Sequence, residues 1–515
     1  MKMSPQDIAQ INSLGISEQE VLSQWDLLKK GCPPIKLIRP CTLGDGIKKI
    51  NPSQIDKWIT LYEKAALSGR AMKFVPASGA ASRMFSALIS YDARLVSENC
   101  EKSVGNEEES INLIRFFQNL PRFAFYQELK SVLHRNDLDI DSLVKQEKHK
   151  TLLEYLLTEK GLNYSKLPKG LIPFHCYQTQ VRTAFEEQLV ETAEYTLDER
   201  GFACIHFTVS PQYETQIKKL IEKIKGSYEN TVLQFKITIS TQKSSTDTLA
   251  VDLSDQPVRD TEGKLVFRPS GHGALLNNLQ AIGGDIVFIK NIDNVARDSV
   301  KNELSKFKKA LGGYLVAVQE KIFSYLKQLK QSDIKEEYLD QVFHFAWEEL
   351  SISPIKIISQ MTIKEKQNFL FQKLNRPIRI CGMVPNHGEV GGGPFWVEDK
   401  DHSYSLQIVE QFQIDLNSSE QKKVFQSSTH FNPVDLVCGL KDFTGNAFDL
   451  GLYVDPDRGF ISIKSKDGKK IKTLERPGLW NGSMAFWNTI FVEVPAATFS
   501  PVKTVLDLLR LEHQE

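Results

Sequence analysis

The fold is decided by a strand, a helix and a second strand that follow one another in the sequence: FACIHFTVS (Phe202–Ser210), YETQIKKLIEKIK (residues 213–225) and VLQFKITIS (residues 232–240). The two outer segments are rich in β-branched and aromatic residues, and the segment between them repeats apolar residues at helical spacing. Further buried-strand patterns stand before and after them, in AMKFVPAS (Ala71–Ser78) and GDIVFIKNIDNV (residues 284–295). Strands that alternate with helices predict an α/β fold with a mainly parallel, mixed sheet flanked by helices. In such sheets ligands bind at the carboxyl ends of the strands.

The bulk composition excludes several classes of protein. A chain of 515 residues exceeds one ordinary core, so we expect two or three domains or one large α/β domain with insertions. The 64 basic and 64 acidic residues cancel, which argues against a nucleic-acid or anionic-membrane partner. Seven scattered cysteines form no CxxC pair and indicate reduced thiols. With no apolar signal segment and no membrane-spanning run, the sequence predicts a cytoplasmic protein.

The order of patterns along the chain predicts its organisation. Residues 1–70 form a helical extension, in which Asn51 or Ser53 caps a helix, and residues 71–515 form the α/β domain. A polar helical insertion is expected at about 86–165, and a long helical block at residues 300–370. Residues 376–515 form a further subregion, with strands expected in RPIRICGMVP, GGGPFWVED, SYSLQIVEQFQI, AFDLGLYVD and GFISIKSKDGKKIKTLE, and a closing helix in TFSPVKTVLDLLRLEHQ.

The loop after the first buried strand, PASGAASRM, is a candidate phosphate-binding loop. Its small residues let backbone amides approach an anion, and Arg83 stands where a following helix would begin. No lysine follows within several residues, and neither GK[ST] nor GxGxxG is present. Taken alone, the pattern is more typical of simple packing between a strand and a helix.

Two further motifs lie near strand ends. In FRPSGHGALLNNL, Gly271 and Gly273 flank His272, which lets the main chain lie flat against a planar ligand, although such a motif can also be an ordinary turn. In VFIKNIDNV, Asp293 follows a buried strand and suits Mg²⁺, which takes one or two protein carboxylates and keeps several waters. The alternative for Asp293 is an Asx turn that closes the strand.

The last two candidates lie in the C-terminal subregion. Three consecutive glycines, Gly391–Gly393, suggest close approach to a ligand or a mobile loop. Glu410 is expected in the middle of an apolar strand, where it binds sugar hydroxyls or forms a structural ion pair. Lys503, in FSPVKT, is by itself an ordinary surface lysine.

Taken in order, these fragments resemble the UDP-glucose pyrophosphorylase type of nucleotidyltransferase. That family has a small-residue loop ending in a lysine, a GHG turn, an NxDN strand end, a GG strand leading to a glutamate, an asparagine segment and a PVK segment. The chain looks still more like an uncharacterised bacterial family of the nucleotide-diphospho-sugar transferase fold. The resemblance runs from about Phe74 to the C-terminus and is strongest in GHGALLNNLQAIGGDIVFIKNIDNV and FSPVKTVLDLL, and moderate in HFNPVDLV.

The resemblance implies a role for each matching residue. Asp293 holds Mg²⁺, and Lys169, in LPKGLIPF, is the lysine of the phosphate loop, displaced by the inserted helices. The remaining implied residues are Ala77, Ser78, Gly79, Ala80, Ser82 and Arg83 for the nucleotide phosphates, Gln242, Gly271 and His272 for the base, Gly392, Gly393, Glu410 and Asn432 for the sugar, and Lys503 for the reacting phosphate.

The implied reaction is transfer of a nucleotidyl group, such as uridylyl, from a nucleoside triphosphate to a sugar 1-phosphate, with release of pyrophosphate. It needs no protein nucleophile, because the sugar phosphate oxygen attacks the α-phosphorus in line while cations neutralise the charge. The expected partners are these small-molecule substrates. Two alternatives are a glycosyltransferase of the same fold, although NIDNV offers one carboxylate where such enzymes usually have DxD, and a catalytically silent sugar-nucleotide-binding protein.

Overall fold

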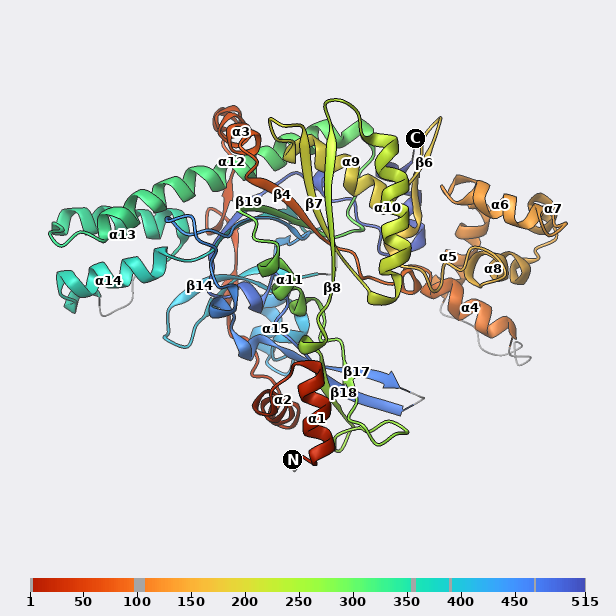
Figure 1. The fold of residues 1–515 in the computed structure, drawn as a ribbon, viewed down its shortest axis with the longest axis horizontal. Coiled ribbons are helices and arrows are strands. Elements are labelled where there is room, and N and C mark those ends of the chain that lie inside the picture. The colour runs from red at the N-terminus through yellow and green to blue at the C-terminus, as the bar shows by residue number, and fades with distance from the viewer. Residues whose placement is uncertain (1–2, 97–106, 353–357, 389–390, 467–468, 515) are drawn as a thin grey trace.

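The computed structural model describes residues 3–96, 107–352, 358–388, 391–466 and 469–514, and it is built around one mixed β-sheet (Figure 1). The strands lie in the order β2-β3-β19-β12-β16-β11-β4-β7-β8, with β15 beside β12. Their bounds are β2 Thr42–Leu43, β3 Gly46–Lys49, β4 Ala71–Pro76, β7 Phe202–Val209, β8 Gln234–Thr241, β11 Ile286–Lys290, β12 Ile378–Pro385, β15 His430–Phe431, β16 Asp435–Gly439 and β19 Asn488–Glu493.

The direction of the strands confirms the predicted fold class. β11 pairs with β4, β4 with β7 and β7 with β8, all in parallel, and β12, β19, β3 and β2 form a second parallel run. β16 lies between the two runs and is antiparallel to both of its neighbours. The two runs therefore point the same way, so that their carboxyl ends share one edge of the sheet.

Helices cover both faces of the sheet. All five residues of β11 are buried, with Ile286 and Phe288 packing into the core on one face and Val287 and Ile289 into the core on the other. This continuous apolar run is typical of a strand covered on both sides. The first core includes side chains of α3 and α12, and the second includes Leu276 and Leu279 of α11. The helices of this central part are α3 Pro52–Leu67, α9 Ala184–Thr196, α10 Glu214–Tyr228, α11 Leu276–Ala281 and α12 Asp298–Leu329.

Two helical regions project from opposite sides of the central sheet (Figure 1). The predicted insertion is helical in its described residues, and its helices are α4 Ser86–Val96, α5 Glu107–Gln118, α6 Tyr126–His134, α7 Ile140–Lys145 and α8 His149–Leu157. Its apolar side chains belong to the same buried cluster as β7 and α10. On the other side lie α13 Glu336–Leu350 and α14 Ile363–Leu374, which continue the predicted helical block.

The N-terminal segment contains the predicted helices α1 Pro5–Leu14, α2 Glu18–Lys30 and α3, and Asn51 caps α3. The expectation of helices alone is incomplete, because β1 (Leu37–Pro40), β2 and β3 also lie here. β1 pairs with β13 (Gly393–Glu398), which pairs with β14 (Tyr404–Val409), and β3 extends the central sheet beside β19. These strands have four residues or fewer, too short for a periodic pattern, and the division at residue 70 stays a prediction.

The remaining strands form two small sheets. β17 (Phe460–Lys466) and β18 (Lys469–Glu475) form the hairpin expected from the sequence, and they join β9 (Thr248–Val251) and β10 (Phe267–Arg268), which the sequence did not indicate. β5 (Pro173–Cys176) pairs with β6 (Val181–Thr183), and a further short α-helix, α15, spans Ser419–Gln426. α1, α2 and the β17–β18 hairpin lie together at one end of the molecule (Figure 1).

Two predicted elements are wrong. AFDLGLYVD is not a strand, because the Asp449 side chain accepts a hydrogen bond from the Gly451 amide and begins a short 3₁₀ helix at Leu450–Tyr453. The C-terminal α-helix is replaced by two short 3₁₀ helices, Val505–Leu509 and Leu511–His513. There the Asp507 carboxylate accepts hydrogen bonds from the amides of Lys503 and Thr504, and His513 contacts His175 at 2.8 Å.

Within the described residues, six cysteines have free thiols, and Cys100 lies outside them. No described group of three or more His, Cys, Asp and Glu side chains could by itself hold a metal ion. The described helices include none with the length and apolar character needed to cross a membrane.

Candidate functional site

The loop after β4 and the segment that carries Lys169 form one structure, although α4–α8 separate them in the sequence. Ala80 and Pro168 form an antiparallel β-bridge. The amide of Ala81 donates a hydrogen bond to the carbonyl of Leu167 at 2.9 Å, and the amide of Lys169 donates to the carbonyl of Gly79 at 2.9 Å. The inserted helices thus leave the loop and return to it, bringing the two segments into contact as the resemblance implied.

The tip of the loop presents backbone donors to the surface. Its base is fixed, because the Ala77 amide donates to the Thr208 carbonyl at 2.8 Å. Ser78, Gly79 and Ala80 are exposed, and among the described residues their amides have no hydrogen-bond partner. A Cβ atom at Gly79 would meet nothing within 4 Å. These amides are therefore available to an oxyanion.

The residues after Ala80 form a turn shorter than the sequence suggested. Ala81–Arg83 is a 3₁₀ helix, and α4 begins only at Ser86. Ser82 is half-buried, and Arg83 is exposed at the end of the turn. The expectation that an α-helix begins at Arg83 is therefore wrong, because Arg83 ends a 3₁₀ turn and the α-helix begins three residues later, at Ser86. Its guanidinium is still free to reach a ligand at the loop, because no ion pair holds it among the described side chains.

Lys169 and Asp293 form an ion pair at the carboxyl edge of the sheet. The Lys169 Nζ atom lies 2.5 Å from Asp293 Oδ2, and the two side chains are 10% and 22% exposed. Close packing fixes the backbone next to Lys169, because a Cβ atom at Gly170 would lie 2.5 Å from the Phe185 ring. Lys169, which the resemblance assigns to the phosphates, is therefore in direct contact with Asp293, which it assigns to the metal.

The loop that carries Asp293 is held from two sides. Gln188 of α9 donates through Nε2 to the carbonyl of Asn291 at 2.8 Å. From the other side, the Val502 amide donates to the Asp293 carbonyl at 3.1 Å, and the Ser500 amide donates to Asn294 Oδ1 at 3.1 Å. These bonds place the segment that carries Lys503 directly beside Asp293.

A pocket of about 180 Å³ opens beside Asp293. It brings together five of the predicted site residues, which are Asp293, Gly392, Glu410, Asn432 and Lys503. Aromatic side chains complete its lining, including Phe431, Trp480 and Phe499. Gly393 lies within β13 and is not part of the lining, since a Cβ atom there would lie 2.8 Å from the Phe395 ring. Gly393 is therefore required for packing, and its predicted contact with a sugar stays a prediction.

Glu410 does not lie in the middle of a strand. β14 ends at Val409, and the Glu410 amide donates to Gln413 Oε1 at 3.0 Å as the chain turns. Burial, together with the nearby charge of Glu475, raises the pKa of Glu410. Among the described residues no cation forms an ion pair with this carboxyl group, so the structural ion-pair alternative has no support. A half-buried acceptor of this kind suits ligand hydroxyl groups.

Asn432 contributes a hydrogen-bond donor to the same pocket. Its Oδ1 atom accepts a hydrogen bond from the backbone amide of Val434 at 2.7 Å. The backbone amide of Asn432 donates to the carbonyl of Gly392 at 2.7 Å. Its side-chain Nδ2 atom is buried and has no partner among the described residues. A buried donor without a partner is costly unless a ligand satisfies it.

The three residues expected to face a base do not line this pocket. Gln242 donates to Asp247 Oδ1 at 3.2 Å. Gly271 has φ +78°, and a Cβ atom there would lie 2.1 Å from Glu475 Oε2. The His272 ring stacks on Trp480 with centroids 4.0 Å apart, and its Nδ1 atom accepts from the Leu479 amide at 3.0 Å. Because burial lowers the pKa of His272 to about 4, the ring is neutral at pH 7, and it packs against Trp480, which lines the pocket.

Sequence reasoning missed several residues that build the site. The aromatic lining residues Phe431, Trp480 and Phe499 belong to segments without a periodic pattern, and Gln188 lies within an ordinary amphipathic helix. Asn294 follows Asp293 in the NIDN motif, but no pattern indicates that its side chain binds the C-terminal segment. No local signal in one sequence identifies such contacts, because their partners lie far away along the chain.

A search of solved structures finds UDP-sugar pyrophosphorylases. A uridine diphosphate N-acetylglucosamine pyrophosphorylase from Trypanosoma brucei, in complex with an inhibitor, matches with a TM-score of 0.49 and 12% identity, over 99% of this chain and 79% of that chain. The UDP-glucose pyrophosphorylase of Leishmania major matches with a TM-score of 0.44 and 12% identity, over 99% and 79% of the two chains.

A comparison with curated proteins finds no match. A family model, by contrast, covers almost the whole sequence, from residue 4 to residue 514. The chain belongs to this family, which is described as a domain of unknown function, DUF4301.

Proposed function

We propose that this protein is a nucleotidyltransferase that forms a nucleoside-diphosphate sugar, with UTP as the expected nucleotide, and releases pyrophosphate. The observation that carries the proposal is the junction of the two loop segments. It joins the loop that carries the free amides of Ser78–Ala80 to Lys169, whose ammonium pairs with Asp293 in the lining of a pocket that offers hydroxyl-binding groups.

Each part of the site has a task in this reaction. The amides of the loop and Arg83 bind the triphosphate, while Lys169 offsets negative charge near the α-phosphorus. Lys503 lines the sugar pocket and holds the attacking phosphate, so that its oxygen lies in line with the leaving pyrophosphate. Glu410 and Asn432 bind sugar hydroxyl groups. No covalent intermediate with the protein is required.

A magnesium ion fits the donor set. Asp293 supplies one carboxylate at the mouth of the pocket, and one of its oxygens is engaged by Lys169. Mg²⁺ is commonly held by one or two carboxylates, with water and substrate phosphates completing the octahedron. Asp293 would therefore hold the ion, which supplies charge neutralisation between the phosphate groups.

The test is pyrophosphate release from UTP and Mg²⁺ with a panel of sugar 1-phosphates. We expect turnover with at least one sugar, and a loss of about a hundredfold or more in Asp293→Asn, as for other lost electrostatic contacts to a transition state. Asp285→Asn is the matched control, because Asp285 stands at the opposite end of β11 and pairs with Arg70. Equal activity of Asp293→Asn and wild type would contradict the metal assignment.

A second pair of variants tests the loop. Lys169→Met should weaken UTP binding by about tenfold, the value of one charge-assisted contact. Lys166→Met removes an exposed lysine that pairs with Glu159, and it should leave UTP binding unchanged. Sugar transfer from a UDP-sugar without pyrophosphate release would indicate a glycosyltransferase instead. Nucleotide-sugar binding without any turnover would indicate a catalytically silent binding protein.

A further inference from the structure

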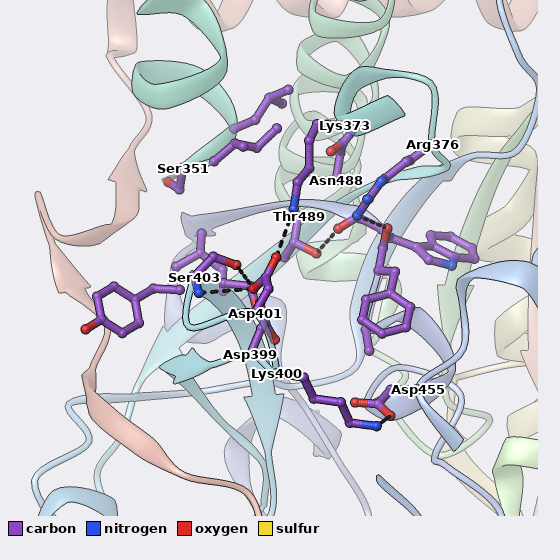
Figure 2. Close-up of a pocket in the computed structure, with 18 residues that line it drawn as sticks. Ser351, Lys373, Arg376, Asp399, Lys400, Asp401, Ser403, Asp455, Asn488 and Thr489 are labelled. Atoms are coloured by element: carbon purple, nitrogen blue, oxygen red, sulfur yellow. Dashed lines mark hydrogen bonds and ion pairs between the residues drawn. The ribbon is translucent and has the colours of Figure 1, made fainter. Parts of the chain in front are cut away.

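A second polar pocket, of about 300 Å³, lies away from the candidate site (Figure 2). It is bounded by the end of α14, by the turn between β13 and β14, and by the beginning of β19. Its charged lining residues are Lys373, Arg376, Asp399, Lys400, Asp401 and Asp455.

The two pockets lie at opposite edges of the sheet. Asn488 and Thr489, the first residues of β19, line the second pocket, whereas Asp293 follows the carboxyl end of the parallel strand β11. β14 runs between the pockets, because Tyr404 lines the second pocket and Glu410, just beyond the end of β14, lines the candidate site. The two sets of lining residues do not overlap, so the second pocket is a separate site.

The carboxylates of this pocket are already engaged. Asp399 accepts a hydrogen bond from Arg458 Nη2 at 3.0 Å, and Asp455 accepts from Arg458 Nε at 2.9 Å. Asp401 accepts from the Ser403 hydroxyl at 2.5 Å and from the Ser403 amide at 3.0 Å. Lys400 pairs with Asp457 outside the pocket. Arg458 thus pairs with Asp399 and Asp455, while Asp401 is bonded within its own turn.

Two further cations line the pocket. Lys373 forms a long ion pair with Asp401, because its Nζ atom lies 3.9 Å from Asp401 Oδ2, beyond hydrogen-bond distance. Arg376 donates through Nε to the Gln372 carbonyl at 3.1 Å and through Nη1 to the Phe486 carbonyl at 3.2 Å. Among the described residues no carboxylate lies within 4.0 Å of its guanidinium. Figure 2 shows the two side chains extending toward the same part of the pocket.

A further donor in the lining lacks a partner. Trp487 lines the pocket with only 5% of its surface exposed, and its Nε1 atom is buried with no hydrogen-bond partner among the described residues. Burial also lowers the pKa of both Lys373 and Arg376, which means that each charge lacks part of the solvation it would have in water. An anion bound here would compensate both cations.

We propose that this pocket binds a small metabolite through an oxyanion, a phosphate or a carboxylate group, held by Arg376 and Lys373. The planar guanidinium is oriented by its two carbonyl contacts, and a guanidinium with an adjacent ammonium is a suitable pair of donors for an oxyanion. The volume is at the lower end of the range for small-molecule sites. The neighbouring hydroxyl groups of Ser351, Ser405 and Thr489 would form hydrogen bonds with the rest of the ligand.

The test is calorimetric titration of the full-length protein with inorganic phosphate and, separately, with succinate. We expect millimolar or tighter binding of at least one anion, weakened by about tenfold or more in Lys373→Met and in Arg376→Gln. Lys364→Met is the control, because it removes an exposed lysine from the same helix, α14, and should bind like wild type. Thermal melting of each variant verifies folding.

The titration also separates this pocket from the candidate site. Lys169→Met should retain the binding that Lys373→Met loses. If only phosphate shows this pattern the ligand carries a phosphate, and if only succinate shows it the ligand carries a carboxylate. The proposal is overturned if neither anion binds, or if the anion binds Lys373→Met and Arg376→Gln as tightly as wild type.

Discussion

Glu191 provides the sharpest test of how the candidate site is supported. It lies in α9 between two buried lysines, with its Oε1 atom 3.1 Å from Lys73 Nζ of β4 and its Oε2 atom 2.7 Å from Lys290 Nζ of β11. All three residues are 2% exposed or less. Burial lowers the pKa of Lys73 to about 7 in spite of the attraction of Glu191. Burial acts to raise the pKa of Glu191, but Lys290 and Lys73 outweigh it and hold the value well below the ordinary one.

Glu191→Gln keeps the size of this side chain and removes its charge. Two buried ammonium groups then lose their counter-charge, which we expect to cost about 3–5 kcal/mol of unfolding free energy. Lys73→Met should cost much less, because Lys290 and Glu191 remain paired. Urea unfolding followed by tryptophan fluorescence measures the difference, with Glu194→Gln, an exposed change on the same helix, as control. If Glu191→Gln were as stable as Lys73→Met, this description of the network would be refuted.

Three further predictions test other parts of the structure. Burial lowers the pKa of His206 to about 4 from 6.5, so the folded protein binds fewer protons than the unfolded chain between these pH values. The unfolding free energy should therefore fall as the pH drops through this window, by up to about 3 kcal/mol at about 1.4 kcal/mol per pH unit. His206→Gln should flatten this pH profile, which urea unfolding measures. Gly271→Ala should lower the melting temperature more than Gly263→Ala, since both glycines have positive φ but only the first would place its Cβ against Glu475; equal melting temperatures would count against the close contact. Asn294→Ala removes the acceptor of the Ser500 amide, which should therefore exchange its hydrogen faster, and an unchanged exchange rate would mean that this bond does not hold the Lys503 segment.

The sequence predicts the central sheet well because its strands are long, apolar runs. β4, β7, β8 and β11 lie where the sequence placed them. β16 and β19, in contrast, were not identified, because a short apolar run has no period that separates a strand from other buried segments. The C-terminal helix failed for a different reason, since Asp507 and His513 make contacts that the helical pattern of that segment does not reveal.

The site was predictable only in part. The motif residues Asp293, Gly392, Glu410, Asn432 and Lys503 line one pocket. The pairing of Lys169 with Asp293 depends on how the inserted helices return to the loop, which is a tertiary property that no local pattern encodes. The same is true of the stack of His272 on Trp480, while the predicted role of the GHG turn toward the base stays a prediction.

The position of a bound nucleotide tests the central claim most directly. Crystals of the protein soaked with UTP and Mg²⁺ should show the phosphates against the amides of Ser78–Ala80, between Lys169 and Asp293. Phosphates bound elsewhere, with the Lys169 and Asp293 ion pair intact and the loop amides facing only water, would contradict the assignment of this edge of the sheet as a nucleotidyl-transfer site.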